Sequence, residues 1–104
     1  MADGSEGVTA MFGTIGRAHL KPENKDNLIQ VLREQAYQQV PGFVRSYVLF
    51  PKDRPDEVFL VAMFESEEVY YQNAEDPAQH ERYLQYRALL EDDPEWTDGE
   101  WLEG

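Results

Sequence analysis

The sequence predicts a single α+β domain in which helices cover one face of a four-stranded antiparallel sheet. The chain has 104 residues, which is the length of one domain. Four segments rich in β-branched and aromatic residues are interleaved with two segments of helical periodicity. Their order is strand, helix, strand, strand, helix, strand, which is the split βαβ or ferredoxin-like arrangement βαββαβ. Two helices are therefore expected on one face of the sheet.

The first predicted strand runs from Val8 to Leu20, where Gly13 and Gly16 are the only residues that disfavour a strand. Residues 1–7 before it are polar and acidic, so we expect a flexible N-terminal tail and a single domain over residues 8–104. A glycine inside a strand often marks a bulge or the close approach of another group. One face of this strand would carry Phe12, Thr14, Gly16, Ala18 and Leu20.

The first predicted helix spans Pro22 to Val40. Proline suits the first turn of a helix, and Pro41-Gly42 marks its end. One apolar stripe is expected along it, because suitable residues recur at helical spacing: Leu28, Val31, Leu32, Gln35 and Ala36.

The middle of the chain predicts a β-hairpin. Phe43–Phe50 and Glu57–Glu65 are rich in β-branched and aromatic residues, and a polar turn with two prolines joins them. Both faces of the second of these strands are apolar, whereas an antiparallel sheet open to water has one polar face. We therefore expect a second copy of the chain to cover the exposed sheet face, which gives a homodimer.

The last third of the chain predicts a helix and a final strand. The helix runs from Ser66, a good N-cap, to about Leu90, and Asp76-Pro77 interrupts it or splits it into two. The final strand covers Glu95–Leu102, with a tryptophan on each side of a Thr-Asp-Gly turn or bulge.

The composition excludes several classes of partner. The net charge of −12 repels phosphate backbones and anionic lipids, so we expect no nucleic-acid binding and no membrane binding. The chain has no cysteine, which excludes disulfides and thiolate sites and suits a cytoplasmic location. The two histidines, His19 and His80, lack the spacing of a metal-binding pair, so we expect no metal and no cofactor.

Three segments carry a resemblance to a known family. The run Val58–Glu68 (VFLVAMFESEE) marks a strand-to-helix junction, Val40–Phe43 (VPGF) a turn after the first helix, and Asp93–Gly99 the end of the domain. Together they resemble the antibiotic biosynthesis monooxygenase (ABM) family, over residues from about Thr9 to Leu102. The resemblance implies a dimeric α+β barrel with a pocket in each subunit between the sheet and its helices.

The same resemblance implies a range of activities. Family members include cofactor-free oxygenases of aromatic polyketides, quinol oxygenases and haem-degrading enzymes, and others bind ligands without known chemistry. The haem-degrading members use an Asn, a Trp and a His that align with Gly16, Asn73 and Tyr83, which argues against haem degradation. Oxygenase members often carry a Trp where this chain has Phe64, so the apolar wall is kept and the indole is lost.

Several polar residues are candidates for a ligand site, each with an ordinary structural alternative. Tyr70 and Tyr83 fall on the inward faces of the second predicted helix, where a phenol either anchors a ligand oxygen or packs in the core. Asn73 lies one turn after Tyr70 and is either buried with a ligand as partner or turned to solvent. His19 and His80 are candidate bases near neutral pH, or else exposed surface residues.

The resulting hypothesis is a cofactor-independent monooxygenase that acts on a quinol or a polycyclic phenol. Such a reaction needs an apolar slot, a base and a few polar anchors. The alternative is a non-catalytic domain of the same fold that binds a small aromatic ligand or a protein partner. The sequence identifies no catalytic residue, and the expected substrate-binding residues are Phe12, Thr14, Phe64, Tyr70, Asn73 and Tyr83.

Overall fold

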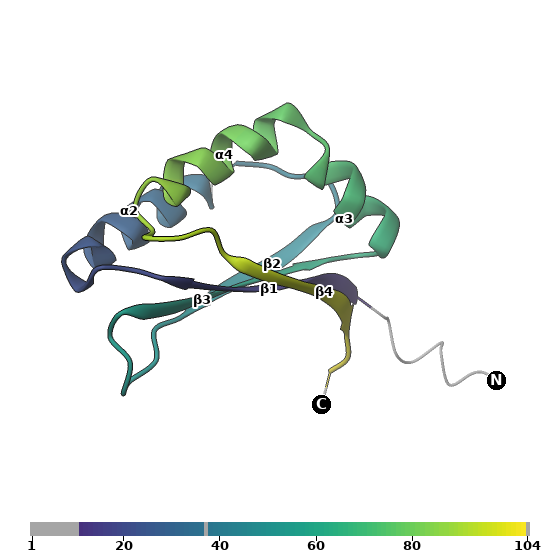
Figure 1. Cartoon of the computed structure of the whole chain (residues 1–104). Helices are drawn as coiled ribbons and strands as arrows, with labels where there is room; N and C mark the ends of the chain where they lie inside the picture. The colour runs from purple at the N-terminus through teal and green to yellow at the C-terminus, as the bar shows by residue number, and fades with distance from the viewer. Residues whose placement is uncertain (1–10, 37, 104) are drawn as a thin grey trace.

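The computed structural model describes residues 11–36 and 38–103, which form a sheet layer and a helix layer (Figure 1). The sheet is antiparallel, with the strand order β2-β3-β1-β4. The ferredoxin-like α+β fold predicted from the sequence is therefore confirmed. The expected tail at residues 1–7 and the start of the first predicted strand lie outside the described residues. The strands are β1 (Met11–His19), β2 (Phe43–Leu49), β3 (Glu57–Phe64) and β4 (Glu95–Trp101).

Within the described residues three α-helices cover one face of the sheet, because the second of the two predicted helices is split in two, as one of the stated alternatives expects (Figure 1). The second predicted helix is split at Asp76, whose Oδ1 accepts the Ala78 N–H at 2.9 Å and so caps the second piece. Pro77 stands in its first turn, where its missing N–H does no harm. The helices are α2 (Lys25–Gln35), preceded by one 3₁₀ turn, η1 (Pro22–Asn24), then α3 (Glu67–Ala74) and α4 (Pro77–Arg87).

The first helix ends earlier than the sequence predicts, at Gln35 and not at Val40. The chain needs the residues after it to cross from the helix layer to the sheet, where Phe43 pairs with Phe64. Gly42 completes the crossing with φ 76°, a left-handed conformation that favours glycine. A Cβ at this position would also overlap the side chain of Val69.

The hydrophobic core lies between α2, α4 and the ends of β1 and β3 that carry Ala18 and Val58. Its largest fully buried side chains are Leu20, Leu28 and Val58. Burying a side chain of this kind contributes roughly 1.5–3 kcal/mol. The rest of the helix-facing side of the sheet, from Thr14 to Phe64, is left for the cavity described below.

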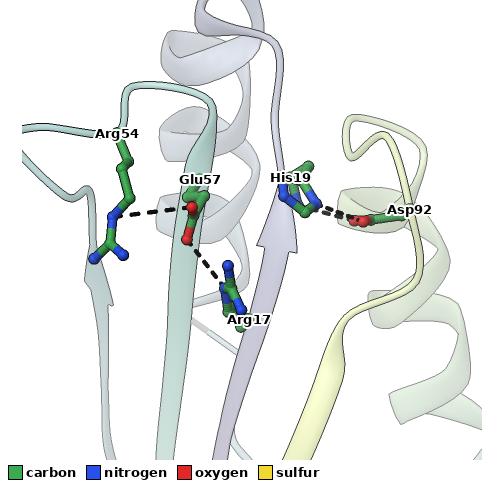
Figure 2. Close-up of polar contacts among 5 residues, drawn as sticks. All are labelled: Arg17, His19, Arg54, Glu57 and Asp92. Atoms are coloured by element: carbon green, nitrogen blue, oxygen red, sulfur yellow. Dashed lines mark hydrogen bonds and ion pairs between the residues drawn. The ribbon is translucent and has the colours of Figure 1, made fainter.

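A set of ion pairs joins the strand ends next to this core (Figure 2). Glu57 is only 8% exposed, and its carboxylate lies between Arg17 (Nε to Oε1, 3.0 Å) and Arg54 (Nε to Oε2, 3.9 Å). The hydrogen bond from Arg17 lowers the pKa of Glu57 against the opposing effect of burial. Next to it, His19 Nδ1 lies 2.6 Å from Asp92 Oδ2, which ties the end of β1 to the segment before β4.

The opposite face of the sheet exposes large apolar side chains. Ile15, Val61 and Tyr47 follow one another across β1, β3 and β2, and Tyr47 is 54% exposed. Leu49 in the next register row is 59% exposed. The pattern is the one that led us to expect a homodimer, which remains a prediction because the structure contains one chain.

Candidate functional site

A cavity of about 510 Å³ lies between the helix-facing side of the sheet and the three α-helices. Ligand pockets for small molecules typically have volumes of about 300–1,000 Å³. Five of the six predicted substrate-binding residues line it: Thr14, Phe64, Tyr70, Asn73 and Tyr83. Their contact with a ligand remains a prediction.

Phe12, the sixth predicted residue, is not among the lining residues and supports the wall from behind. It is buried, and its ring lies 5.4 Å from the Tyr70 ring and 5.6 Å from the Tyr71 ring. Tyr70 in turn packs edge-on against Phe64, with 5.5 Å between ring centroids, and Phe64 packs edge-on against Phe43 at 5.6 Å. These contacts hold one aromatic wall of the cavity in a fixed arrangement.

Trp96 forms part of the lining and was not predicted as a site residue. Its indole lies over Gly16, so that a Cβ on Gly16 would come within 2.6 Å of the indole Cε3. The sequence signal that could have found it is Gly16 itself, because a glycine inside a strand often marks the close approach of another group. Gly16 on β1 has no side chain, and the indole of Trp96 on β4 lies in the space that a side chain would fill. The indole therefore forms part of the cavity wall.

Two tyrosines converge on one carboxylate at the β4 side of the cavity. Tyr70 donates to Asp98 Oδ1 at 3.0 Å, and Tyr71 donates to Asp98 Oδ2 at 3.1 Å. Burial, reinforced by the hydrogen bond to Asp98, raises the pKa of Tyr70 to about 12. Its phenol therefore stays protonated at neutral pH. Both Tyr70 and Asp98 line the cavity, so this wall carries a hydrogen-bond donor and an anion.

Helix α4 contributes a second pair of aromatic side chains. Tyr83 and Tyr86 pack edge to face, with 5.4 Å between ring centroids, and both line the cavity. Burial raises the pKa of Tyr86 well above its ordinary value. Tyr83 also packs against the hydrophobic core, as the core-packing alternative expects, and its contact with a ligand oxygen remains a prediction.

A cluster of polar side chains lines the cavity between the end of α2 and the α3–α4 junction. Arg82 donates to Asn73 Oδ1 at 3.3 Å, to Gln79 Oε1 at 3.1 Å and 3.2 Å, and to Gln38 Oε1 at 3.2 Å. Asn73 also donates to Gln79 at 3.3 Å, so its partners are side chains of the same cluster. Gln35 closes the group by donating to the Arg82 carbonyl at 2.9 Å. Sequence reasoning missed Arg82, because it stands in a polar run that is typical of a solvent-exposed helix face.

The two candidate bases lie in different places. His80 is exposed, lines the cavity and stacks on Tyr83, with 6.5 Å between ring centroids. His19 is not among the lining residues, and its imidazole faces Asp92 in the ion-pair region of Figure 2. The hydrogen bond to Asp92 raises the pKa of His19. Of the two, His80 is the histidine within reach of a ligand in the cavity.

Residues 11–36 and 38–103 contain no group of three or more His, Cys, Asp or Glu side chains placed to hold a metal ion. Within the same residues, no helix combines the length and the hydropathy needed to cross a membrane.

The fold and the cavity define a small ferredoxin-like α+β domain with space for a ligand under its helices. The sequence profile of the antibiotic biosynthesis monooxygenase family matches residues 11–86, which is more than half of the chain. The chain belongs to this family, as the resemblance of its motifs implied.

Solved structures agree on the fold. A Chloroflexus aurantiacus protein, provisionally assigned as an antibiotic biosynthesis monooxygenase, is 24% identical, with a TM-score of 0.71 over 90% of this chain and 95% of that chain. A Caulobacter crescentus protein with the same provisional assignment is 11% identical, with a TM-score of 0.75 over 95% and 97% of the two chains. A variant of SnoaB, a cofactor-independent oxygenase from Streptomyces nogalater, is 18% identical, with a TM-score of 0.58 over 88% and 89%. The comparison with curated proteins found no match.

Proposed function

We propose that the protein is a cofactor-independent monooxygenase that oxidises a quinol or a polycyclic phenol inside this cavity. The observation that carries the proposal is a cavity of about 510 Å³ that combines aromatic walls with the phenol hydroxyl of Tyr70 and the imidazole of His80. The similarity in fold to a cofactor-independent oxygenase is consistent with it. The cytoplasmic location expected from the sequence is part of the same proposal.

The reaction assigns a role to each kind of group in the lining. His80 removes the proton of the substrate hydroxyl, since an imidazole accepts protons near neutral pH. The resulting anion passes one electron to O₂, and the radical pair collapses to form a carbon–oxygen bond. The O–O bond then breaks and the second oxygen atom leaves as water. A phenol plus O₂ thus gives a quinone plus water, with all electrons supplied by the substrate.

Tyr70 is the proposed hydrogen-bond donor to the substrate anion, and its single O–H, which donates to Asp98 Oδ1 at 3.0 Å in the free protein, would turn from Asp98 to the ligand. Its raised pKa keeps the phenol protonated at the pH of the reaction. The aromatic wall formed by Phe43, Phe64 and Tyr70 would face the ring system of the substrate and exclude water from the reacting atoms. Thr14 donates its hydroxyl to the Thr97 carbonyl at 3.1 Å, so in this arrangement it contributes shape rather than a free donor.

A second candidate function is ligand binding without turnover. Both Tyr70 and Tyr86 have raised pKa values, so these groups donate hydrogen bonds and do not accept protons. Donors of this kind serve a binding site as well as they serve a reaction. The role of His80 therefore separates the two functions, because only turnover requires a base.

The protein is also proposed to be a homodimer whose subunits meet through the exposed sheet face. The apolar row of Ile15, Val61 and Tyr47, in which Ile15 and Tyr47 are exposed and Val61 is half-buried, supports this arrangement, and exposed Leu49 continues it. Light scattering at micromolar concentration is expected to give twice the chain mass of 12.1 kDa. A mass of one chain at that concentration would contradict the dimer.

The test of activity is oxygen uptake with a panel of quinols and polycyclic phenols, with a chelator present and no cofactor added. Uptake above the buffer rate is expected, and it should fall at least about tenfold in Tyr70→Phe. Tyr71→Phe is the matched control, because Tyr71 donates to the same carboxylate but does not line the cavity. His80→Gln should also abolish uptake. No uptake with any compound would favour binding without turnover.

A further inference from the structure

Arg82 presents a positive charge to the cavity, and none of the described residues places a carboxylate against it. Three other arginines of the described chain, at positions 17, 54 and 87, each have a carboxylate oxygen within 4.0 Å. Arg82 instead directs its N–H groups at carboxamide oxygens of three side chains: Gln38, Asn73 and Gln79. Among residues 11–36 and 38–103, no carboxylate oxygen lies within 4.0 Å of its guanidinium.

Among the described residues Arg33 and Arg45 also have no carboxylate oxygen within 4.0 Å, but Arg82 is the one of the three that lines the cavity. A carboxamide oxygen orients a guanidinium through its dipole but leaves the full unit of charge in place. A guanidinium stays protonated in proteins, so the charge cannot be lost by deprotonation. The cluster therefore fixes the position of a cation and keeps it available.

The fixed cation and its neutral partners all line the cavity. A guanidinium has five N–H donors, and the contacts to Gln38, Asn73 and Gln79 use four of them. One Nη1 N–H has no partner among the described residues. The second Nη1 N–H donates to Gln38 Oε1 at 3.2 Å. The Gln38 side chain is exposed, so an incoming oxygen displaces it at little cost.

We propose that Arg82 anchors a carboxylate carried by the aromatic ligand, with Asn73, Gln79 and Gln38 as the residues that position it. This inference rests on the proposed function, since it adds an anionic group to the aromatic molecule that the cavity holds. A carboxylate accepts strong, charge-assisted N–H···O bonds from a guanidinium, and the two Nη1 N–H groups are the ones that it would reach here. It also needs such an anchor here, because the net negative charge of the protein otherwise repels it.

The anchor and the proposed reaction involve different groups. Asp98, held by Tyr70 and Tyr71, lies on β4, whereas Arg82 lies on α4 and contacts the end of α3 and the segment after α2. A ligand carboxylate would be repelled by Asp98 and attracted by Arg82. The two charges thereby select one orientation of the ligand, with its carboxylate at Arg82 and its reacting ring toward the aromatic wall.

Equilibrium binding of two matched probes tests the inference without any need for turnover. One probe is 1-hydroxy-2-naphthoic acid and the other is its neutral carboxamide, and the dissociation constants are measured by isothermal titration. The wild-type protein is expected to bind the acid about ten- to a hundredfold more tightly than the amide, as charged hydrogen bonds allow. In Arg82→Gln this preference should disappear while affinity for the amide is unchanged. Arg82→Lys should keep part of the preference.

Arg33→Gln is the control for net charge, because Arg33 is exposed on α2 and is not among the lining residues. It should keep the preference for the acid. Three results would overturn the inference. They are equal affinity of the wild-type protein for both probes, an equal loss of affinity for the acid and the amide in Arg82→Gln, and no binding of either probe. If the wild-type protein shows no oxygen uptake but still prefers the acid to the amide, only the monooxygenase proposal is contradicted.

Discussion

The indole of Trp96 occupies the space above Gly16 in which any larger residue would carry its side chain. A Cβ on Gly16 would lie 2.6 Å from the indole Cε3 and 2.9 Å from Cη2, well inside contact distance. Because the indole is part of the cavity lining, the absence of a side chain on β1 determines the shape of a wall contributed by β4.

Gly16→Ala is therefore expected to move Trp96 and change the cavity. With Trp101→Phe as the background, Trp96 is the only tryptophan, and its fluorescence maximum should shift in Gly16→Ala. Gly99→Ala is the matched control on β4, because a Cβ there meets no atom within 4 Å. An unchanged spectrum in Gly16→Ala, or an equal shift in both variants, would contradict the description of this wall.

The hydroxyl of Tyr70 should titrate only at very high pH, because burial and its bond to Asp98 raise its pKa to about 12. Absorbance at 295 nm follows the ionisation of the tyrosines as pH rises. In Tyr70→Phe, the change observed below pH ~11 should equal that of the wild-type protein, since Tyr70 stays protonated over this range. Only after unfolding should the variant show a smaller increase in absorbance than the wild-type protein, because Tyr70 then ionises like an ordinary tyrosine. A smaller native change near pH 10 would mean that Tyr70 is exposed.

The pair of His19 and Asp92 should make stability depend on pH. The pKa of His19 is raised above its ordinary 6.5, so its contribution is fully present below that value and is lost as pH rises through the folded-state pKa. The pKa of Asp92 is lowered below its ordinary 3.8, so its contribution is present above that value and is lost at more acidic pH. The pair therefore stabilises the fold most between about pH 4 and pH 6.5.

Urea unfolding at pH 5.5 and pH 8.5 measures this effect. The free energy of unfolding of the wild-type protein should be lower at pH 8.5 than at pH 5.5. The decrease should be smaller in His19→Gln. His80→Gln serves as the control, because among the described residues His80 has no carboxylate partner. An identical fall in the wild-type protein and His19→Gln would show that the pair does not contribute. Both groups are partly exposed, so the sign of the effect is the prediction.

Leu28 should be among the most sensitive positions in the core. Its side chain is fully buried, and Leu28→Ala leaves a space that a packed core closes only in part. The expected loss of unfolding free energy is about 2–5 kcal/mol. Leu84→Ala, at a position 47% exposed on α4, should cost less than about 1 kcal/mol. Equal losses in the two variants would contradict the placement of the core.

The strands, their order along the chain and the break at Asp76-Pro77 were predictable because they depend on local signals. Apolar alternation, the cap at Ser66 and a proline in the first turn of α4 act over a few residues, and each is visible in the sequence. The early end of α2 at Gln35 was not predictable in this way, because helical periodicity continues beyond it. The length needed to cross from the helix layer to β2 is a property of the assembled fold.

The candidate site was predictable only where a side chain follows directly from the period of its element. Tyr70 and Tyr83 lie on inward helix faces that the spacing identifies. Arg82 and Trp96 line the cavity because of partners far away in the sequence, Gln38 for the first and Gly16 for the second. A single sequence does not reveal such partners, although the glycine in β1 already indicated that something packs against it.

The cavity under the helices is the proposed ligand site. The most direct test is a titration of the Trp101→Phe protein with 1-naphthol, followed by the fluorescence of Trp96. Saturable quenching is expected, and it should be lost in Ala62→Phe and Ser46→Phe, which fill the cavity from two different strands while thermal unfolding verifies that each variant is folded. Absence of saturable quenching, or equal quenching in the filled variants, would show that the ligand does not bind in this cavity.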